Sequence, residues 1–225
     1  MKEEDFIEHL FIASTHDYLL VFTERGRIHW VKGYEIPQVA PAAKGKHIAQ
    51  LLKIDKEDKV AALLKVSAFE EGKFIVSCTE SGIIKKTELQ AYSNPRAGGI
   101  IAQKLREGDR IIAVNLTDGA KDIFLATRQG KSIRFHEEDV RDMGRVSTGV
   151  IGIRLRKGDA VVDMCITSRG RGTILNVCER GFGKRTEIDE YRLQGRGGQG
   201  VINIKTSERN GLVVAQGLAG HPVLA

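Results

Sequence analysis

The sequence predicts an all-β protein of propeller-like architecture, built from four copies of a unit of about 50 residues. A first glycine precedes a short strand that carries basic residues, and it recurs at Gly26, Gly82, Gly130 and Gly181. A second glycine precedes a strand of alternating character, and it recurs at Gly45, Gly99, Gly149 and Gly200. The two series keep the same phase, which indicates an internal repeat. Long stretches of helical periodicity are absent.

The order of segments is the same in each unit, and residues 59–109 show it clearly. Two runs rich in β-branched residues, Val60–Val66 and Phe74–Thr79, precede the pair Ser81-Gly82. Glycine accepts a positive φ without steric cost, so this pair favours a tight hairpin turn. The basic strand follows the turn, and a polar loop leads to the alternating strand. Four short strands per unit are typical of a propeller blade.

We therefore expect a single domain, residues 1–225, made of four-stranded blades. The units cover about 7–58, 59–109, 110–159 and 160–211, and a further unit begins in 212–225. The alternating strand of the first unit should be Gly45–Leu51. A propeller normally closes its blades into a ring, which protects the edges of its sheets. Because only four complete units are visible, we expect an incomplete or open wheel.

The composition is basic, and the charge is uneven along the chain. The 225 residues include 35 Lys and Arg against 29 Asp and Glu, which gives a net charge of +6 and a pI near 9.2. Residues 1–58 hold 8 basic and 10 acidic residues, whereas residues 59–225 hold 27 and 19. A basic surface favours nucleic acid or acidic lipid as a partner. Few aromatic residues flank the basic positions, which argues against a stacking platform for single strands.

Other sequence features argue against an enzyme, a metal protein or a membrane protein. No apolar run reaches the ~18 residues of a membrane span, and no secretory signal is visible, so we expect a cytoplasmic protein. Cys78, Cys165 and Cys178 lack C-x-x-C spacing and are expected to be buried free thiols in strands. Gly195–Gly200 reads G-x-G-x-x-G, but a strand follows it, which disfavours a dinucleotide site. We expect no catalytic residues, no metal and no cofactor.

Basic residues recur at fixed phases of the repeat. Residues at one phase occupy the same radial position on every blade, so they should form a belt around the rim of the wheel. A curved belt of positive charge can neutralise phosphates along bent DNA without reading its bases. A solvated face with ordinary charge is the alternative explanation. The candidate DNA-binding residues are Lys44, Lys46, Lys85, Lys86, Arg96, Lys131, Arg134, Arg145, Lys184, Arg185, Arg192 and Arg196.

Several segments resemble the C-terminal domain of the A subunit of bacterial DNA gyrase. They are Lys2–Ile7, Ser14–Asp17, Arg25–Arg27, Phe69–Gly72, Gly130–Phe135, Thr148–Leu155, Gly183–Thr186 and Glu208–Val214. The resemblance implies a β-pinwheel, a propeller variant in which neighbouring blades share strands. It implies wrapping of duplex DNA, without sequence preference, in support of ATP-dependent negative supercoiling by the whole enzyme. It also implies partners in the rest of gyrase A and, through it, gyrase B, and a location in the bacterial cytoplasm at the nucleoid.

Two features depart from that family. Its hallmark box, Q-[RK]-R-G-G-[RK]-G, would lie upstream of Lys2–Ile7 and is expected to be missing from this sequence. A degenerate box-like motif occurs three blades later, and it consists of Gln194, Gly195, Arg196, Gly197, Gly198, Gln199 and Gly200. The family commonly has six blades, whereas four units are visible here. The alternative interpretations are the C-terminal domain of the topoisomerase IV protein that corresponds to gyrase A, and a protein-interaction propeller.

Overall fold

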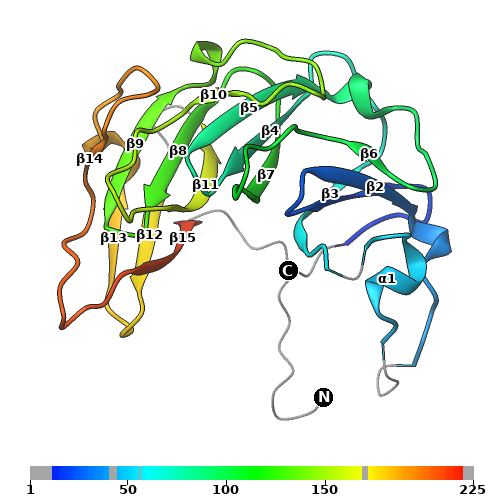
Figure 1. Ribbon diagram of the computed structural model, residues 1–225, viewed down its shortest axis with the longest axis horizontal. Coiled ribbons are helices and arrows are strands. Elements are labelled where there is room, and N and C mark those ends of the chain that lie inside the picture. The colour runs from blue at the N-terminus through cyan, green and yellow to red at the C-terminus, as the bar shows by residue number, and fades with distance from the viewer. Residues whose placement is uncertain (1–11, 41–44, 56, 169–171, 220–225) are drawn as a thin grey trace.

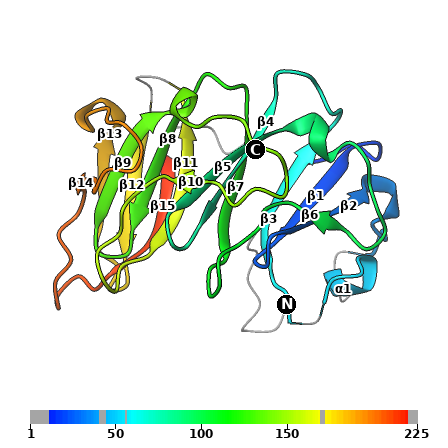
Figure 2. The same ribbon diagram turned by 45° about the horizontal axis from the view of Figure 1, so that its top comes forward.

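Four antiparallel sheets follow one another along an arc (Figures 1 and 2). The computed structural model describes residues 12–40, 45–55, 57–168 and 172–219. Three of the sheets have four strands and the last has three. One strand of each sheet lies on the concave side of the arc, and the outermost strands of the four-stranded sheets lie on the convex side (Figure 1). The expected all-β fold of blades that do not close into a ring is therefore confirmed.

Each sheet is built on a hairpin. The hairpins are β1 (Tyr18–Thr23) with β2 (Arg27–Lys32), β4 (Phe74–Thr79) with β5 (Ile83–Glu88), β8 (Asp122–Thr127) with β9 (Lys131–His136), and β12 (Thr173–Cys178) with β13 (Gly183–Glu187). The turn glycines Gly26, Gly82, Gly130 and Gly181 have φ of 80°, 83°, 80° and 78°, a region that strains any residue with a Cβ. The four predicted turns are thus confirmed.

A threonine ends the first strand of three hairpins and fixes the following turn. The hydroxyls of Thr23, Thr79 and Thr127 each accept a hydrogen bond at 3.2 Å from the backbone amide four residues later. All three side chains are buried, so the hydrogen bond compensates for the loss of water. The fourth hairpin has Cys178 at this position. The same local chemistry therefore produces the same turn in successive repeats.

Every hairpin is completed by strands from the next repeat. The first sheet gains β3 (Val60–Val66) on its concave side and the two-residue strand β6 (Ile100–Ile101) on its convex side. The second gains β7 (Ile111–Thr117) and β10 (Val150–Ile151), the third gains β11 (Val161–Thr167) and β14 (Val201–Ile202), and the fourth gains β15 (Val213–Ala219). Neighbouring blades therefore share strands, as in a β-pinwheel, and each sheet combines segments of two sequence units.

The expected alternating strand at Gly45–Leu51 is wrong. Residues Ile48–Leu51 form the short helix α1, and the ring of His47 accepts a hydrogen bond from the amide of Ala49 at 3.2 Å. The outer strands β6, β10 and β14 exist because each pairs with the hairpin of the preceding repeat. The described residues contain no hairpin before β1, so the first such segment lacks a strand to pair with. It packs Ile48 into an apolar cluster with Val31 instead.

The core lies between successive sheets. A short 3-10 turn follows each hairpin, at η1 (Gly33–Glu35), η2 (Leu89–Tyr92), η3 (Glu137–Asp139) and η4 (Ile188–Glu190). The 3-10 turns after the second and fourth hairpins bury Leu89 and Ile188 between the sheets. The rings of Phe124 and Tyr191 meet edge to face, with centroids 4.8 Å apart. Because each repeat buries its apolar residues against the next, the blades form one connected body.

The cysteines match the expectation of free thiols in strands. Cys78 in β4 and Cys178 in β12 are buried, and Cys165 in β11 is half-buried. Within the ranges that the structure describes, no helix has the length and apolar character needed to cross a membrane.

Candidate nucleic-acid interface

The convex edge of the arc is formed by three segments, residues 93–106, 141–157 and 192–207, which we call the rim. Each rim segment consists of a loop followed by one outer strand, β6, β10 or β14 (Figure 1). Backbone hydrogen bonds connect the segments in order. The amide of Lys104 donates to the carbonyl of Ser147 at 3.3 Å, and the amide of Arg154 donates to the carbonyl of Gly198 at 2.9 Å. The rim is therefore a continuous ribbon across three repeats.

The rim is almost purely basic. Its three segments contain 11 Lys and Arg and a single acidic residue, Asp142, whose carboxylate pairs with Lys86 at 3.1 Å. Among the described residues, no carboxylate lies within 4.0 Å of a basic side chain of the rim. By contrast, Arg25, Arg110 and Arg128, which lie outside the rim, each pair with a glutamate. The positive charge of the rim is thus available to an anionic ligand.

Four of the predicted DNA-binding residues lie on the rim. Arg96, Arg192 and Arg196 are exposed, and Arg145 is half-buried. The guanidinium of Arg196 lies along the ribbon, where Nε donates to the carbonyl of Asp139 at 2.8 Å and Nη1 donates to that of Ile151 at 3.3 Å. Arg196 therefore fixes its loop to the neighbouring repeat while its charge stays at the surface.

The box-like motif Gln194–Gly200 forms the loop of the third rim segment. Gly197 and Gly200 have φ of 76° and 67°. A Cβ at Gly200 would collide with the carbonyl oxygen of Ser132 on β9, so glycine lets the loop lie directly on the hairpin. Lys131, predicted as a DNA-binding residue, is half-buried and donates from Nζ to the carbonyl of Gln199 at 3.3 Å. The motif is therefore a loop that packs on the third hairpin.

The other predicted residues lie elsewhere. Lys46 is exposed but precedes α1, outside the rim. Lys184 and Arg185 are exposed on β13, in the last sheet. The structure therefore does not bring these three residues into the rim. Lys44 lies outside the described residues.

The expectation that Lys85, Lys86 and Arg134 belong to an exposed belt is wrong. They are 1%, 7% and 8% exposed. Lys86 and Arg134 form ion pairs with Asp142 and Asp122 at 3.1 and 2.7 Å, and Lys85 donates to backbone carbonyls. In these blades the strand after the turn is not the outermost strand. It is instead covered by the outer strand and the loop of the next repeat, so these cations are in the interior.

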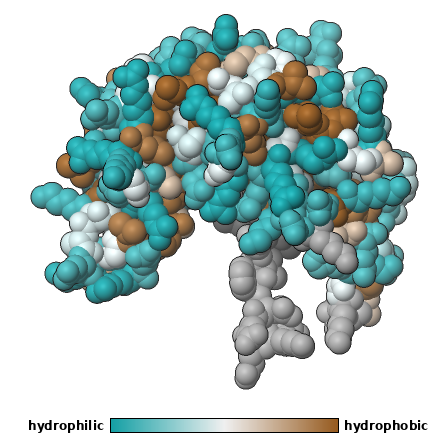
Figure 3. All heavy atoms as spheres, viewed as in Figure 1, coloured by the Kyte–Doolittle hydropathy of each residue, from teal (hydrophilic) through white to brown (hydrophobic). Residues whose placement is uncertain are grey.

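Sequence reasoning missed a second set of basic residues that recur at one position of the repeat. Lys104, Arg154 and Lys205 each lie five residues after the glycine of the second series, and all three are exposed. They lie within the predicted alternating strands and could have been found by noting that a basic residue recurs five positions after the glycine in three of the four units. Apolar side chains share this surface, since Ile101, Ile151 and Ile202 of the outer strands are 46%, 37% and 67% exposed. Figure 3 shows apolar patches among hydrophilic side chains over the molecule.

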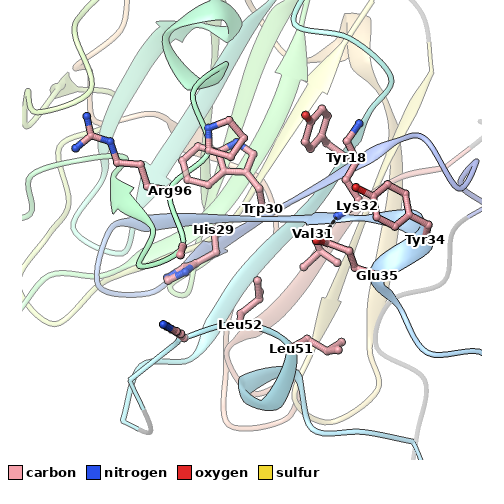
Figure 4. Close-up of a pocket in the computed structure, with 13 residues that line it drawn as sticks. Tyr18, His29, Trp30, Val31, Lys32, Tyr34, Glu35, Leu51, Leu52 and Arg96 are labelled. Atoms are coloured by element: carbon pink, nitrogen blue, oxygen red, sulfur yellow. Dashed lines mark hydrogen bonds between the residues drawn. The ribbon is translucent and has the colours of Figure 1, made fainter.

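A cavity of about 470 Å³ lies at the first blade, between β2, the end of α1 and the rim loop that carries Arg96 (Figure 4). Trp30, Lys32 and Glu35 are among its lining residues. Lys32 Nζ lies 3.4 Å from the centroid of the Tyr18 ring, and the Glu35 carboxylate accepts from the backbone amide of Lys32 at 2.7 Å. The only acid in the lining is thus engaged with the backbone. Among the described residues that line the cavity, no hydrogen-bonded pair of acidic and basic side chains is found.

Two thiols and one histidine are held in their neutral forms by burial. Burial raises the pKa of the Cys165 thiol to about 11 and also raises that of Cys78, so neither forms a thiolate readily at neutral pH. Burial lowers the pKa of His29, which favours its neutral form. Within the described ranges, no three His, Cys, Asp or Glu side chains gather in a way that could hold a metal ion. The rim is therefore the candidate site.

Comparison with known proteins finds a matching family. The model described as DNA gyrase C-terminal domain, beta-propeller, matches residues 17–67, 73–118, 121–168 and 179–215. The DNA gyrase A protein of Salmonella typhimurium is 47% identical over 214 residues, which cover 95% of this chain and 24% of that protein. The DNA gyrase A protein of Haemophilus influenzae is 43% identical over 242 residues, which cover 96% of this chain and 28% of that protein. The chain thus spans about a quarter of the length of these relatives.

Two solved structures share the fold. The C-terminal domain of DNA topoisomerase IV matches with a TM-score of 0.84 and 28% identity, over 91% of this chain and 64% of that one. A DNA gyrase A C-terminal domain matches with a TM-score of 0.77 and 23% identity, over 92% of this chain and 67% of that one.

Proposed function

Because the chain belongs to the family of DNA gyrase C-terminal domains, we propose that its rim binds the phosphate backbone of duplex DNA and bends the DNA around the arc. The observation that carries the proposal is the charge of the rim, with 11 basic residues and one acid that is already paired. Each phosphate that the rim neutralises releases condensed counterions, so affinity arises on any sequence. The convex course of the rim favours bent over straight DNA.

Within a whole gyrase A protein, this module would wrap DNA beside the part that cleaves it and so support ATP-dependent negative supercoiling. The role requires neither a catalytic residue nor a cofactor in this chain. Its other partners would be the remainder of gyrase A and, through it, gyrase B, in the bacterial cytoplasm at the nucleoid. We also propose that residues 1–225 act as one domain, because successive blades share strands.

A salt titration of duplex binding tests the proposal. The variant Lys104→Glu, Arg154→Glu, Lys205→Glu reverses one exposed charge in each rim segment. It should weaken binding on every sequence and reduce the slope of log affinity against log salt by about 3, roughly one for each phosphate contact. The matched control reverses Arg25, Arg110 and Arg128, which carry the same charge outside the rim. Equal losses for both variants, or no duplex binding by the wild-type chain at low salt, would contradict the proposal.

A topological assay separates wrapping from simple contact. Relaxed circular DNA is saturated with the chain, its linking number is reset by a type I topoisomerase, and the protein is removed. Wrapping leaves a change in linking number that grows with bound protein, whereas straight contact leaves none.

The similarity to the topoisomerase IV domain supports a second candidate, a DNA-contacting module of that enzyme. Joined to the catalytic remainder, a gyrase module would produce negative supercoils from relaxed DNA with ATP, and the second candidate would only relax DNA. Competition by heparin distinguishes both from a protein-interaction propeller, whose partner heparin would not displace.

A further inference from the structure

We propose that Lys85 is a positioning residue for the rim: its buried ammonium group joins two successive rim segments and holds the loop that presents Arg145. This inference rests on the proposed function for its link to DNA, whereas its structural part stands on the contacts of Lys85 alone.

The contacts of Lys85 join separate parts of the rim. Lys85 lies on β5 and is 1% exposed. Its Nζ donates to the carbonyl of Ala102 in the first rim segment, and to those of Gly144 at 3.3 Å and Arg145 at 2.7 Å in the second. Three N–H donors thus meet three carbonyl oxygens in two segments that are far apart in sequence. Lys85 therefore helps to set the position of one rim loop relative to the preceding outer strand, together with the backbone hydrogen bond from Lys104 to Ser147.

The fold itself does not require a cation at this position. The corresponding residues, three after the turn glycine, are His29 in the first hairpin and Ile133 in the third. Ile133 is completely buried in the core between sheets. Packing alone favours an apolar residue, because a buried charge without a carboxylate partner costs more than it contributes. Burial lowers the pKa of Lys85 to about 7, and Arg145 is the charged side chain that adds to this shift. The hydrogen bonds from Lys85 to the loop that carries Arg145 explain why a lysine occupies this buried position.

The adjacent position, four residues after the turn glycine, repeats this arrangement. Trp30 Nε1 donates to the carbonyl of Tyr92 at 3.0 Å. Arg134 Nη1 donates to the carbonyls of Ile188 at 2.9 Å and Tyr191 at 3.3 Å. In each case a side chain of one hairpin holds the backbone that enters the rim loop of the next repeat. The arrangement at Lys85 is thus part of a recurring contact between repeats.

The last hairpin supplies a natural comparison. Lys184 has the same position as Lys85, three residues after a turn glycine. It is exposed, and no hydrogen bond or ion pair from its ammonium group is found among the described residues. Removal of Lys184 should therefore remove one surface charge without releasing a rim loop.

The test compares Lys85→Met with Lys184→Met in the whole chain. Trypsin cleaves after Arg145, and cleavage in the native state requires local opening of the loop. Loss of the contacts from Lys85 should speed this cleavage roughly tenfold, because about one net hydrogen bond is lost. Binding and wrapping of duplex DNA should weaken severalfold. Lys184→Met should leave the cleavage rate unchanged and, because Lys184 lies on β13 outside the rim, should leave duplex binding and its salt slope unchanged as well.

The outcomes separate the possible roles. Unchanged cleavage after Arg145 in a folded Lys85→Met would overturn the proposal, and so would weaker DNA binding without faster cleavage, since that points to Lys85 as a direct ligand. Lys85→Gln, which keeps two N–H donors, should show an intermediate cleavage rate and replaces the methionine variant if that variant fails to unfold cooperatively. If the wild-type chain binds no DNA, the proposed function fails, and the cleavage comparison still decides whether Lys85 holds the loop.

Discussion

The free energy of unfolding should rise with pH above neutrality because of Lys85. Burial lowers the pKa of this ammonium group from 10.5 to about 7 in the folded chain. Between these two values the unfolded chain binds a proton that the folded chain does not, so stability increases as pH rises through the window. The full difference corresponds to at most ~5 kcal/mol, at about 1.4 kcal/mol per pKa unit. From pH 7 to 8.5 the expected gain is about 2 kcal/mol.

Urea denaturation at constant ionic strength measures this gain in the free energy of unfolding. The wild-type chain and Lys85→Met are compared at pH 7, 7.75 and 8.5. Burial raises the pKa of the Cys78, Cys165 and Cys178 thiols above the ordinary value of 9.0, so they lower stability as pH rises toward and past that value. The effect is the same in both proteins and cancels in their comparison. Averaged over this range, the wild-type slope should exceed the variant's by about 1 kcal/mol per pH unit, since Lys85 is half titrated at pH 7. Parallel slopes would refute the reasoning, because they would mean that the ammonium group stays protonated in the folded state.

Three further substitutions test the interior. Burial raises the pKa of Asp163 to about 6, so the protonated carboxyl stabilises the fold below pH 4. This contribution, up to ~3 kcal/mol, is lost as pH rises to about 6. In urea titrations over the acid range, Asp163→Asn should remove this pH dependence of the free energy of unfolding. Arg134→Met removes one partner of the fully buried Asp122 carboxylate, which keeps the His136 ring at 2.6 Å, and should lower the free energy of unfolding by about 3 kcal/mol at pH 7. A loss under 1 kcal/mol, within the ~0–1 kcal/mol range of exposed ion pairs, would contradict this. Gly130 has a φ of 80° and faces a carbonyl of the next repeat, so Gly130→Ala should lower the free energy of unfolding by about 2 kcal/mol. A Cβ at Gly45 meets no atom within 4 Å, so Gly45→Ala should change the free energy of unfolding little. Equal losses of stability in thermal melts would disprove the steric argument.

The parts of the fold that could be predicted from the sequence depend on local chemistry. A glycine at φ near 80° and a threonine that caps the turn act within four residues, so the hairpins were identifiable from the repeat. The partner of β6 is β2, about 70 residues earlier in the chain, and periodicity within a segment contains no information about that pairing. For the same reason the alternation at Gly45–Leu51 predicts a strand, although its pairing partner is missing among the described residues.

The assignment of basic residues failed for a related reason. Alternation along β5 places Lys85 and Lys86 on opposite faces of one strand, and a lysine is normally exposed. Both faces are covered here, because the next repeat lays its outer strand and loop over the hairpin. The residues that remain exposed, Lys104 and Arg154, follow the covering strand instead. Phase in the repeat shows which positions carry basic residues, but which of these residues are exposed depends on the three-dimensional pairing of the strands.

The curvature of the rim is set by the protein rather than by DNA. The same backbone hydrogen bond attaches each rim segment to the preceding turn glycine: Ala102 donates to Gly26 at 2.8 Å, Gly152 to Gly82 at 2.8 Å, and Asn203 donates to the third turn glycine at 2.9 Å. Repetition of one contact repeats one angle between blades, so the arc exists before DNA binds. The protein then loses little conformational freedom on binding, and the main cost is the bending of the duplex, about 1–6 kcal/mol for a site of 20–30 base pairs. That cost changes much less with salt than the phosphate contacts that offset it, which weaken steeply as salt rises. Bent complexes should therefore be lost at lower salt than short, straight contacts on the same rim.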